Sequence, residues 1–352
     1  MRAAVYTGSS TVRVQEVPTP VPGPGELLVR VEACGICHTD LKKIQHNLLP
    51  GPRIFGHETA GVVVATSEDV SAFAPGDRVV VFHHVPCLDC FYCRRKLYAQ
   101  CATYKKVGVT AGYEPSGGGF AEYVRVMSWI VPQGVERIPE GVPFERACFV
   151  EPVNTCLKAV RVLAPQPEET VLILGQGPIG LLFTMLVRRE GATVAATDTI
   201  ARRRALALRF GAAAAWDPLA CDVAAEVAKI TEGRGADAVI VAASAPGIVE
   251  EALRCSRPGA RILLFAQTSR QETIEVCGAD ICVAERTLVG CYSASVDLQK
   301  ESAALVFSGE LAVEELISHR IRLEEIQAGI ELALHPSEES LKIVVQPQRR
   351  FA

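Results

Sequence analysis

The sequence predicts an α/β plus β fold class, in which a β-rich domain accompanies a domain built on a parallel sheet. Three observations support this prediction. The 352 residues exceed what one hydrophobic core usually organises. Short β-type runs bounded by Gly and Pro fill residues 1 to about 150. From Glu169 onward, strand-like runs alternate with helical segments. We therefore expect two domains.

The β-rich part contains clear runs at 11–17, 26–32, 59–65 and 77–82, a spacing typical of a small all-β barrel or sandwich. In the second part, strand-like runs at 171–174, 194–197, 238–242 and 261–265 alternate with helical segments at 178–190, 201–210 and 247–255. Such alternation is typical of βαβ units. Two helices (297–308 and 323–334) and a strand (341–346) are expected to close the chain.

Composition and charge exclude several classes of protein. With 49% hydrophobic and 22% charged residues, the chain is neither disordered nor a coiled coil. A net charge of −4 without a long Lys/Arg run argues against nucleic acid binding. No apolar stretch reaches the roughly 18 to 20 residues of a membrane helix, and the chain starts like a strand rather than a signal peptide. We expect a cytoplasmic protein with no membrane partner.

A glycine-rich turn follows the predicted strand 171–174. Gly175 permits the tight turn, Gly177 lets the backbone approach a diphosphate, and Gly180 allows close packing of helix and sheet. Pro178 suits the first helical turn. Asp198 ends the next strand, 18 positions after Gly180, where a carboxylate binds ribose hydroxyls. A flexible glycine loop is the alternative, but the complete context favours a dinucleotide site.

Thirteen cysteines, an odd number in a long chain, argue against a disulfide framework. Four of them have the spacing of a tetrahedral zinc site within a lobe at about 84–103: Cys87, Cys90, Cys93 and Cys101. Four thiolates leave no position for substrate, so this zinc would be structural. An iron–sulfur cluster or four uninvolved thiols are the alternatives.

A second, dispersed set provides one thiolate, one imidazole and two carboxylates: Cys37, His57, Glu58 and Glu151. Taken singly, each has an ordinary reading as a core or surface residue. Together they suit an exchangeable, catalytic zinc site with a place for water or a substrate oxygen. Spacing alone does not exclude nearby competitors for ligand roles, namely Cys34, His38, His83 and His84.

In their order along the chain, these motifs resemble those of zinc-dependent medium-chain dehydrogenases. Glu151, where many alcohol dehydrogenases have cysteine, makes the sequence similar to the sorbitol-type polyol and L-threonine dehydrogenase branch. The resemblance implies a GroES-like catalytic domain at 1–152, an inserted Rossmann domain at 153–291, doubly wound around a parallel sheet, and a return to the catalytic domain at 292–352. It also implies a homo-oligomer, a tetramer or a dimer.

The resemblance further implies roles for single residues. Cys37, His57 and Glu58 would be catalytic zinc ligands, with Glu151 as an exchangeable fourth ligand. Contacts to the cofactor would come from Ile179, Asp198 and Arg203, with Phe265, Cys291 and Tyr292 on the nicotinamide side. Thr39 would accept the substrate proton. The family's usual histidine three residues later is Lys42 here, so the proton leaves Thr39 by another route.

We therefore expect an enzyme with two zinc ions per chain that passes hydride between a secondary alcohol of a polyol, sugar or amino alcohol and NAD, with NADP less favoured. Asp40 is a candidate to orient the imidazole of His57. The alternatives are an alcohol dehydrogenase of broader range, a zinc-free quinone or enoyl reductase, and a non-catalytic protein that binds NAD and zinc on the same fold.

Overall fold

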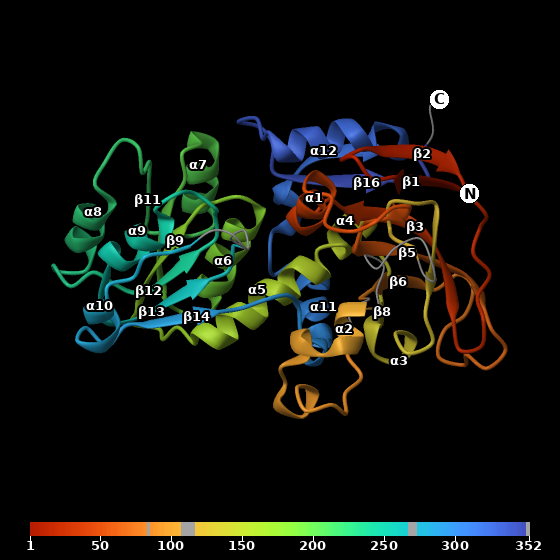
Figure 1. Cartoon of the computed structure of the whole chain (residues 1–352), viewed down its shortest axis with the longest axis horizontal. Coiled ribbons are helices and arrows are strands. Elements are labelled where there is room, and N and C mark those ends of the chain that lie inside the picture. Colours follow the sequence, from red (N-terminus) through yellow and green to blue (C-terminus); the bar gives the residue numbers. More distant parts are fainter. Residues whose placement is uncertain (83–84, 107–116, 267–272, 350–352) are drawn as a thin grey trace. The chain divides into compact units, whose positions relative to one another are not determined.

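The computed structural model describes residues 1–82, 85–106, 117–266 and 273–349. The chain forms two compact units (Figure 1). Unit 1 comprises Met1–Asn154 and Ala294–Ala352, and unit 2 comprises Thr155–Ser293. Among the described residues, no helix combines the length and apolar character needed to cross a bilayer.

Unit 1 is built on two sheets. A three-stranded antiparallel sheet has the order β2-β1-β4, and a larger sheet has the order β15-β16-β3-β5-β6-β8, with β7 also paired to β3. The strands are β1 (Arg2–Tyr6), β2 (Val12–Glu16), β3 (Leu27–Gly35), β4 (Arg53–Ile54), β5 (Glu58–Thr66), β6 (Arg78–Val81), β7 (Tyr123–Val126), β8 (Val135–Arg137), β15 (Ile317–Arg322) and β16 (Lys342–Gln346).

Short helices surround these sheets: α1 (His38–Gln45), α2 (Ala102–Lys106), α3 (Val131–Gly134), α4 (Phe144–Ala147), α11 (Gln299–Phe307) and α12 (Ile326–Leu334), with 3₁₀ turns η1 (Cys93–Arg95), η2 (Tyr98–Gln100), η3 (Val296–Leu298), η4 (Val313–Leu316) and η5 (Leu323–Glu325). Valines on alternate positions of β3 form the centre of the core, because the side chains of a strand alternate between its faces. In the antiparallel register of β3 and β5, Gly35 lies opposite Glu58. This pairing fixes the position of one candidate metal ligand.

Unit 2 is a six-stranded parallel sheet of order β11-β10-β9-β12-β13-β14. Its strands are β9 (Thr170–Leu174), β10 (Thr193–Thr197), β11 (Ala214–Trp216), β12 (Ala236–Val241), β13 (Ser256–Leu264) and β14 (Thr287–Gly290), and its helices are α5 (Val150–Leu163, which starts in unit 1), α6 (Pro178–Arg189), α7 (Ala201–Arg209), α8 (Val223–Ile230), α9 (Ile248–Cys255) and α10 (Gly278–Cys282). Helices α6 and α7 lie on one face of the sheet, and α8 and α9 lie on the other (Figure 1).

The strand order of unit 2 is that of a doubly wound dinucleotide-binding sheet, with its switch point between β9 and β12. Ligands of such sheets bind at the carboxyl ends of the strands beside the switch point. The glycine-rich turn follows β9 at this place. The α/β plus β class predicted from the sequence is confirmed.

Candidate functional site

Three of the candidate ligands for a catalytic metal meet in unit 1. Cys37 lies directly before α1, His57 directly before β5, and Glu58 is the first residue of β5. Their ligand atoms all lie within 4.8 Å of one another. His57 and Glu58 are buried, and Cys37 is half-buried. One thiolate, one imidazole and one carboxylate, of which the thiolate is only half-buried, fit a catalytic zinc site.

A buried carboxylate holds the imidazole of His57. Asp40, on the first turn of α1, is fully buried, and its Oδ1 lies 3.1 Å from Nδ1 of His57. Burial alone lowers the pKa of His57, but Asp40 and Cys37 raise it by more, so that this pKa lies well above its ordinary value. The surroundings of His57 are therefore strongly negative and suit a bound cation, and Asp40 leaves Nε2 as the atom available to it.

Glu58 has a buried cationic partner that sequence reasoning missed. Nζ of Lys342, on β16, donates to Oε1 of Glu58 (2.5 Å) and to the carbonyl oxygen of Ile36 (3.1 Å). Lys342 is only 5% exposed. A Cβ at Gly35 would lie 1.8 Å from Oε2 of Glu58, so only glycine leaves room for this carboxylate. The one available signal was a single charged residue in the closing strand.

Glu151 lies at the start of α5, with 8% of its surface exposed. Burial raises its pKa to about 7, with Glu58 and Asp40 adding to the rise while His57 and Lys342 oppose it. Its carboxylate is not part of the group within 4.8 Å, so its role as fourth ligand stays a prediction.

The other candidates around this site differ in position. The group of close ligand atoms does not contain the competitors Cys34 and His38, and His83 and His84 lie outside the described residues. Thr39 is half-buried on the first turn of α1.

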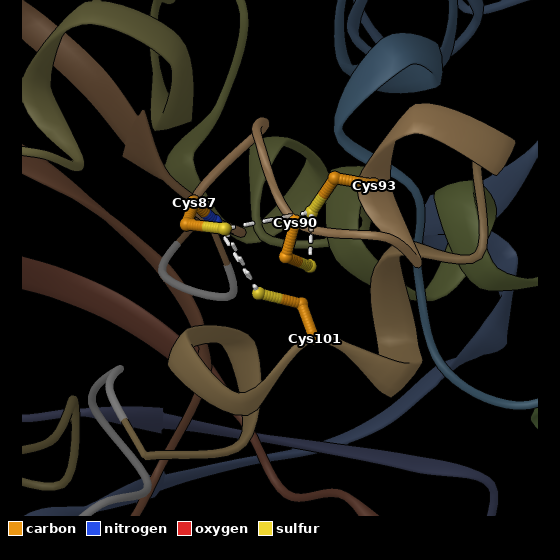
Figure 2. Close-up of side chains that lie close together, drawn as sticks. All are labelled: Cys87, Cys90, Cys93 and Cys101. Carbon is orange, nitrogen blue, oxygen red and sulfur yellow. Dashed lines mark hydrogen bonds between the residues drawn. The ribbon is translucent and has the colours of Figure 1, made fainter.

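The four clustered cysteines converge in unit 1 (Figure 2). Neighbouring sulfur atoms are 3.5 Å apart for Cys90 and Cys93, 3.6 Å for Cys87 and Cys101, and 3.9 Å for Cys87 and Cys93. Zinc–sulfur bonds of about 2.3 Å in a tetrahedron place sulfurs roughly 3.8 Å apart, whereas a disulfide needs about 2.05 Å. The geometry fits a structural zinc site.

The lobe around these cysteines has little core of its own. Its buried cluster consists of Cys93, Tyr98, Ala99, Cys101 and Tyr104. Burial raises the pKa of the Cys101 thiol, but backbone N–H groups, led by that of Cys87, lower it to about 6. Such a thiol is readily available as a thiolate, the form that binds metal. We infer that zinc supplies much of the folding free energy of this lobe.

We expect Cys93→Ser to lower the zinc content from about two to about one ion per chain and to destabilise the lobe, because a structural zinc site contributes folding free energy directly. Activity per folded molecule should survive better than after loss of Cys37. Metal analysis and thermal unfolding test this, with Cys282→Ser, an exposed cysteine outside both groups, as the matched control. Iron and sulfide, or one zinc, in the wild type would contradict the two-site interpretation.

The glycine turn of unit 2 has the expected shape. Gly175 has a φ of +95°, and a Cβ there would lie 2.5 Å from Cβ of Ala243. A Cβ at Gly180 would lie 1.9 Å from the carbonyl oxygen of Gly175. At Gly177, by contrast, nothing lies within 4 Å. Among the described residues, the space around Gly177 is therefore open, as required of a backbone that a diphosphate approaches, and α6 begins with Pro178 next to it.

Asp198 follows β10 and is held by the backbone. Its Oδ2 accepts from the N–H of Gln176 (2.7 Å) and its Oδ1 from the N–H of Ile200 (2.8 Å). Nη1 of Arg203 lies 3.8 Å from Oδ2 of Asp198. Arg204 instead donates to the carbonyl oxygens of Asp198 (2.7 Å) and Thr199 (2.9 Å) and to Asp217 (3.1 Å). Only one of these two arginines thus lies at the carboxylate itself.

The remaining cofactor candidates lie at the carboxyl ends of strands or beside the turn. Phe265 follows β13, and its ring packs edge-on against Phe183 at 4.9 Å. Cys291 and Tyr292 follow β14, and Ile179 is half-buried on the first turn of α6. Nζ of Lys158, which the sequence did not single out, donates to the carbonyl oxygen of Tyr292 (2.8 Å). Lys158 thereby fixes the backbone after β14.

A dinucleotide-type sheet together with two ligand sets that fit zinc defines a zinc-dependent dehydrogenase. Comparison with known proteins agrees: residues 23–136 match the model of the alcohol dehydrogenase GroES-like domain, and residues 178–308 match that of zinc-binding dehydrogenases. The chain belongs to the family of zinc-dependent medium-chain alcohol dehydrogenases and is an NAD(P)-dependent enzyme of this kind.

Individual relatives extend over nearly the whole chain. L-threonine 3-dehydrogenase of Pyrococcus horikoshii is 33% identical over 315 residues, which cover 87% of each chain. Sorbitol dehydrogenase of Bacillus subtilis is 29% identical over 355 residues, which cover 99% of this chain and 98% of the relative's chain. A protein of Sinorhizobium meliloti 1021, assigned as a zinc-binding dehydrogenase and bound to NADP, is 32% identical with a TM-score of 0.89, covering 98% and 99%.

Proposed function

We propose that the enzyme oxidises a secondary alcohol of a polyol, sugar or amino alcohol with NAD. The observation that carries the proposal is the buried Glu151 beside the Cys37–His57–Glu58 group, in place of a further thiol. Sorbitol and threonine, the substrates named for two relatives, both carry a secondary hydroxyl next to another polar group. A carboxylate beside the metal ligands suits such substrates because it accepts a hydrogen bond from the neighbouring hydroxyl or ammonium group.

Cys37, His57 and Glu58 would hold the catalytic zinc, with Glu151 as an exchangeable fourth ligand. When bound, zinc supplies Lewis-acid polarisation of the substrate oxygen. Asp40 keeps His57 oriented through Nδ1, and Lys342 holds Glu58 through Oε1. The nicotinamide carries the redox chemistry. The protein's part is to orient the substrate hydroxyl and remove its proton.

Thr39 is the proposed first acceptor of that proton, at Oγ1. It follows Cys37 by two positions and is half-buried. Lys42 lies one turn further along α1, at the position where the family resemblance implies a histidine. We propose that the ribose hydroxyls of the cofactor and water take the proton onward, without a histidine.

For the cofactor, we propose a preference for NAD over NADP of at least about tenfold in kcat/KM, roughly 1.4 kcal/mol. The carboxylate of Asp198, fixed by two backbone N–H groups, would bind the ribose 2′-hydroxyl of NAD and repel the 2′-phosphate of NADP. Arg204 is already engaged with Asp217 and two carbonyl groups, which leaves Arg203 as the arginine beside the carboxylate. A relative binds NADP, so this preference must be tested in this chain.

The expected result is that Asp198→Ser shrinks the NAD to NADP ratio, mainly by weakening NAD. Steady-state kinetics with both cofactors measure it, and Asp217→Ser, which alters a contact of Arg204 instead, is the matched control. Equal or faster turnover of the wild type with NADP would show that the arginines outweigh the carboxylate.

Formation of NADH against a panel of polyols, sugars, amino alcohols and simple alcohols tests the substrate class. The proposal requires secondary alcohols with a neighbouring polar group to exceed simple alcohols in kcat/KM. Turnover of simple alcohols alone would favour the broader alcohol dehydrogenase. The absence of turnover in zinc-loaded protein that binds NADH would favour the non-catalytic alternative.

A further inference from the structure

A fully buried glutamine lies inside the glycine turn of unit 2. Gln176 stands between Gly175 and Gly177 and is 0% exposed. Its Oε1 accepts a hydrogen bond from Oγ1 of Thr184, on α6, at 2.9 Å. Thr184 is also fully buried, and its hydroxyl lies 3.1 Å from the carbonyl oxygen of Gly180. The amide thus links the turn to the second turn of α6.

The amide of Gln176 is not satisfied by the protein. Within the part of the chain that the structure describes, its Nε2 has no hydrogen-bond partner. The carbonyl end of the amide faces Thr184, and the amino end is the buried group without a partner among the described residues. A buried polar group without a partner is destabilising. A glutamine at such a position calls for a reason other than stability.

We look for this reason in the contacts of Gln176 with Asp198 and with the start of α6. The backbone N–H of Gln176 donates to Oδ2 of Asp198 at 2.7 Å, so one residue contacts both the helix that starts at the diphosphate position and the carboxylate proposed for the ribose. A Cβ at Gly180 would lie 3.5 Å from Nε2 of Gln176, so the amide lies beside the helix start. Fixing the side chain therefore fixes the direction of the peptide N–H.

We infer that Gln176 is a positioning residue for the cofactor: through Thr184 it locks the glycine turn and, through its own N–H, the carboxylate of Asp198. This inference rests on the proposed cofactor site. Loss of this hydrogen bond would let the turn and Asp198 reorient. Part of the free energy of cofactor binding would then be used to order them. The contribution is to binding, not to the hydride step.

The test uses the full-length, zinc-loaded enzyme with Gln176→Met, which keeps the length of the side chain without its amide, and Thr184→Val, which keeps the shape without the hydroxyl. We expect each variant to weaken NADH about five- to tenfold by fluorescence titration and to raise KM for NAD similarly, with kcat within about twofold. The double variant should be no weaker than the weaker single variant, because both break one contact. Gln176→Met should not lower Tm, because it removes an unsatisfied amide.

Thr231→Val is the matched control, since Thr231 is a buried threonine of the same unit whose hydroxyl bonds the backbone of Val227 (2.7 Å) and Gly235 (3.0 Å) away from the glycine turn. It should lower Tm and leave NADH affinity unchanged. NADH affinity within twofold of wild type in Gln176→Met, or a loss that Thr231→Val reproduces, would overturn the inference. A wild-type enzyme that does not bind NADH would overturn the cofactor site itself.

Discussion

Cys37→Ala and His57→Ala are each expected to lower kcat by at least about a thousandfold, while NADH binds within a few-fold of the wild-type affinity. Lewis-acid polarisation is worth several kcal/mol, and about 4 kcal/mol corresponds to this factor. The candidate ligands all lie in unit 1, whereas the glycine turn and Asp198 lie in unit 2. Substitution of a zinc ligand should therefore lower kcat without a large change in NADH affinity.

Three measurements check this prediction: kcat, zinc content and a fluorescence titration with NADH on the same folded preparation. Cys34→Ala is the matched control, because Cys34 is a buried cysteine three positions before Cys37 that lies outside the group of close ligand atoms. It should keep its catalytic zinc and most of its activity. If Cys34→Ala were inactive and Cys37→Ala active, Cys34 rather than Cys37 would be the zinc ligand. Loss of NADH binding in folded Cys37→Ala would disprove the separation.

Local patterns predicted the β-rich part and the parallel sheet well, because the information for them lies within short segments. The run at 59–65 is part of β5 (Glu58–Thr66), and the run at 171–174 is part of β9. The sequence analysis did not assign β11 (Ala214–Trp216) or α8 (Val223–Ile230). β11 has three residues, two of them alanine, which form strands weakly. It owes its place to its parallel pairing with β10.

Long-range partners were beyond the reach of spacing. Asp40 was predicted to orient His57 because metal-binding imidazoles usually have a carboxylate partner, and the structure places the two side chains in hydrogen-bond contact. Lys342 reaches Glu58 across 284 positions. No local pattern links them, since the contact depends on β16 pairing with β3, and β3 with β5. A buried charge partner of this kind is found only once the sheet order is known.

We expect Lys342→Met to have the largest effect on stability. Lys342 and Glu58 are 5% and 1% exposed, and breaking a buried ion pair by removal of one partner typically costs about 3 to 5 kcal/mol, because the other charge is left uncompensated. Burial lowers the pKa of Lys342, but Glu58 and Cys37 raise it by more, to above its ordinary value, so the lysine is charged. Without it, the buried carboxylate of Glu58 loses the ammonium group that it contacts.

The effect of zinc on stability distinguishes loss of the Lys342–Glu58 ion pair from a simple packing defect. In metal-free protein, Lys342→Met should lower the free energy of unfolding by about 3 to 5 kcal/mol. A divalent cation compensates the same negative charges, so adding zinc should narrow the gap to wild type. Lys342→Arg, which keeps the charge, should lie closer to wild type than Lys342→Met does. Denaturant unfolding of these variants with and without zinc decides between an electrostatic role and a packing role of Lys342. An equal loss in both conditions would mean that Lys342 contributes packing alone.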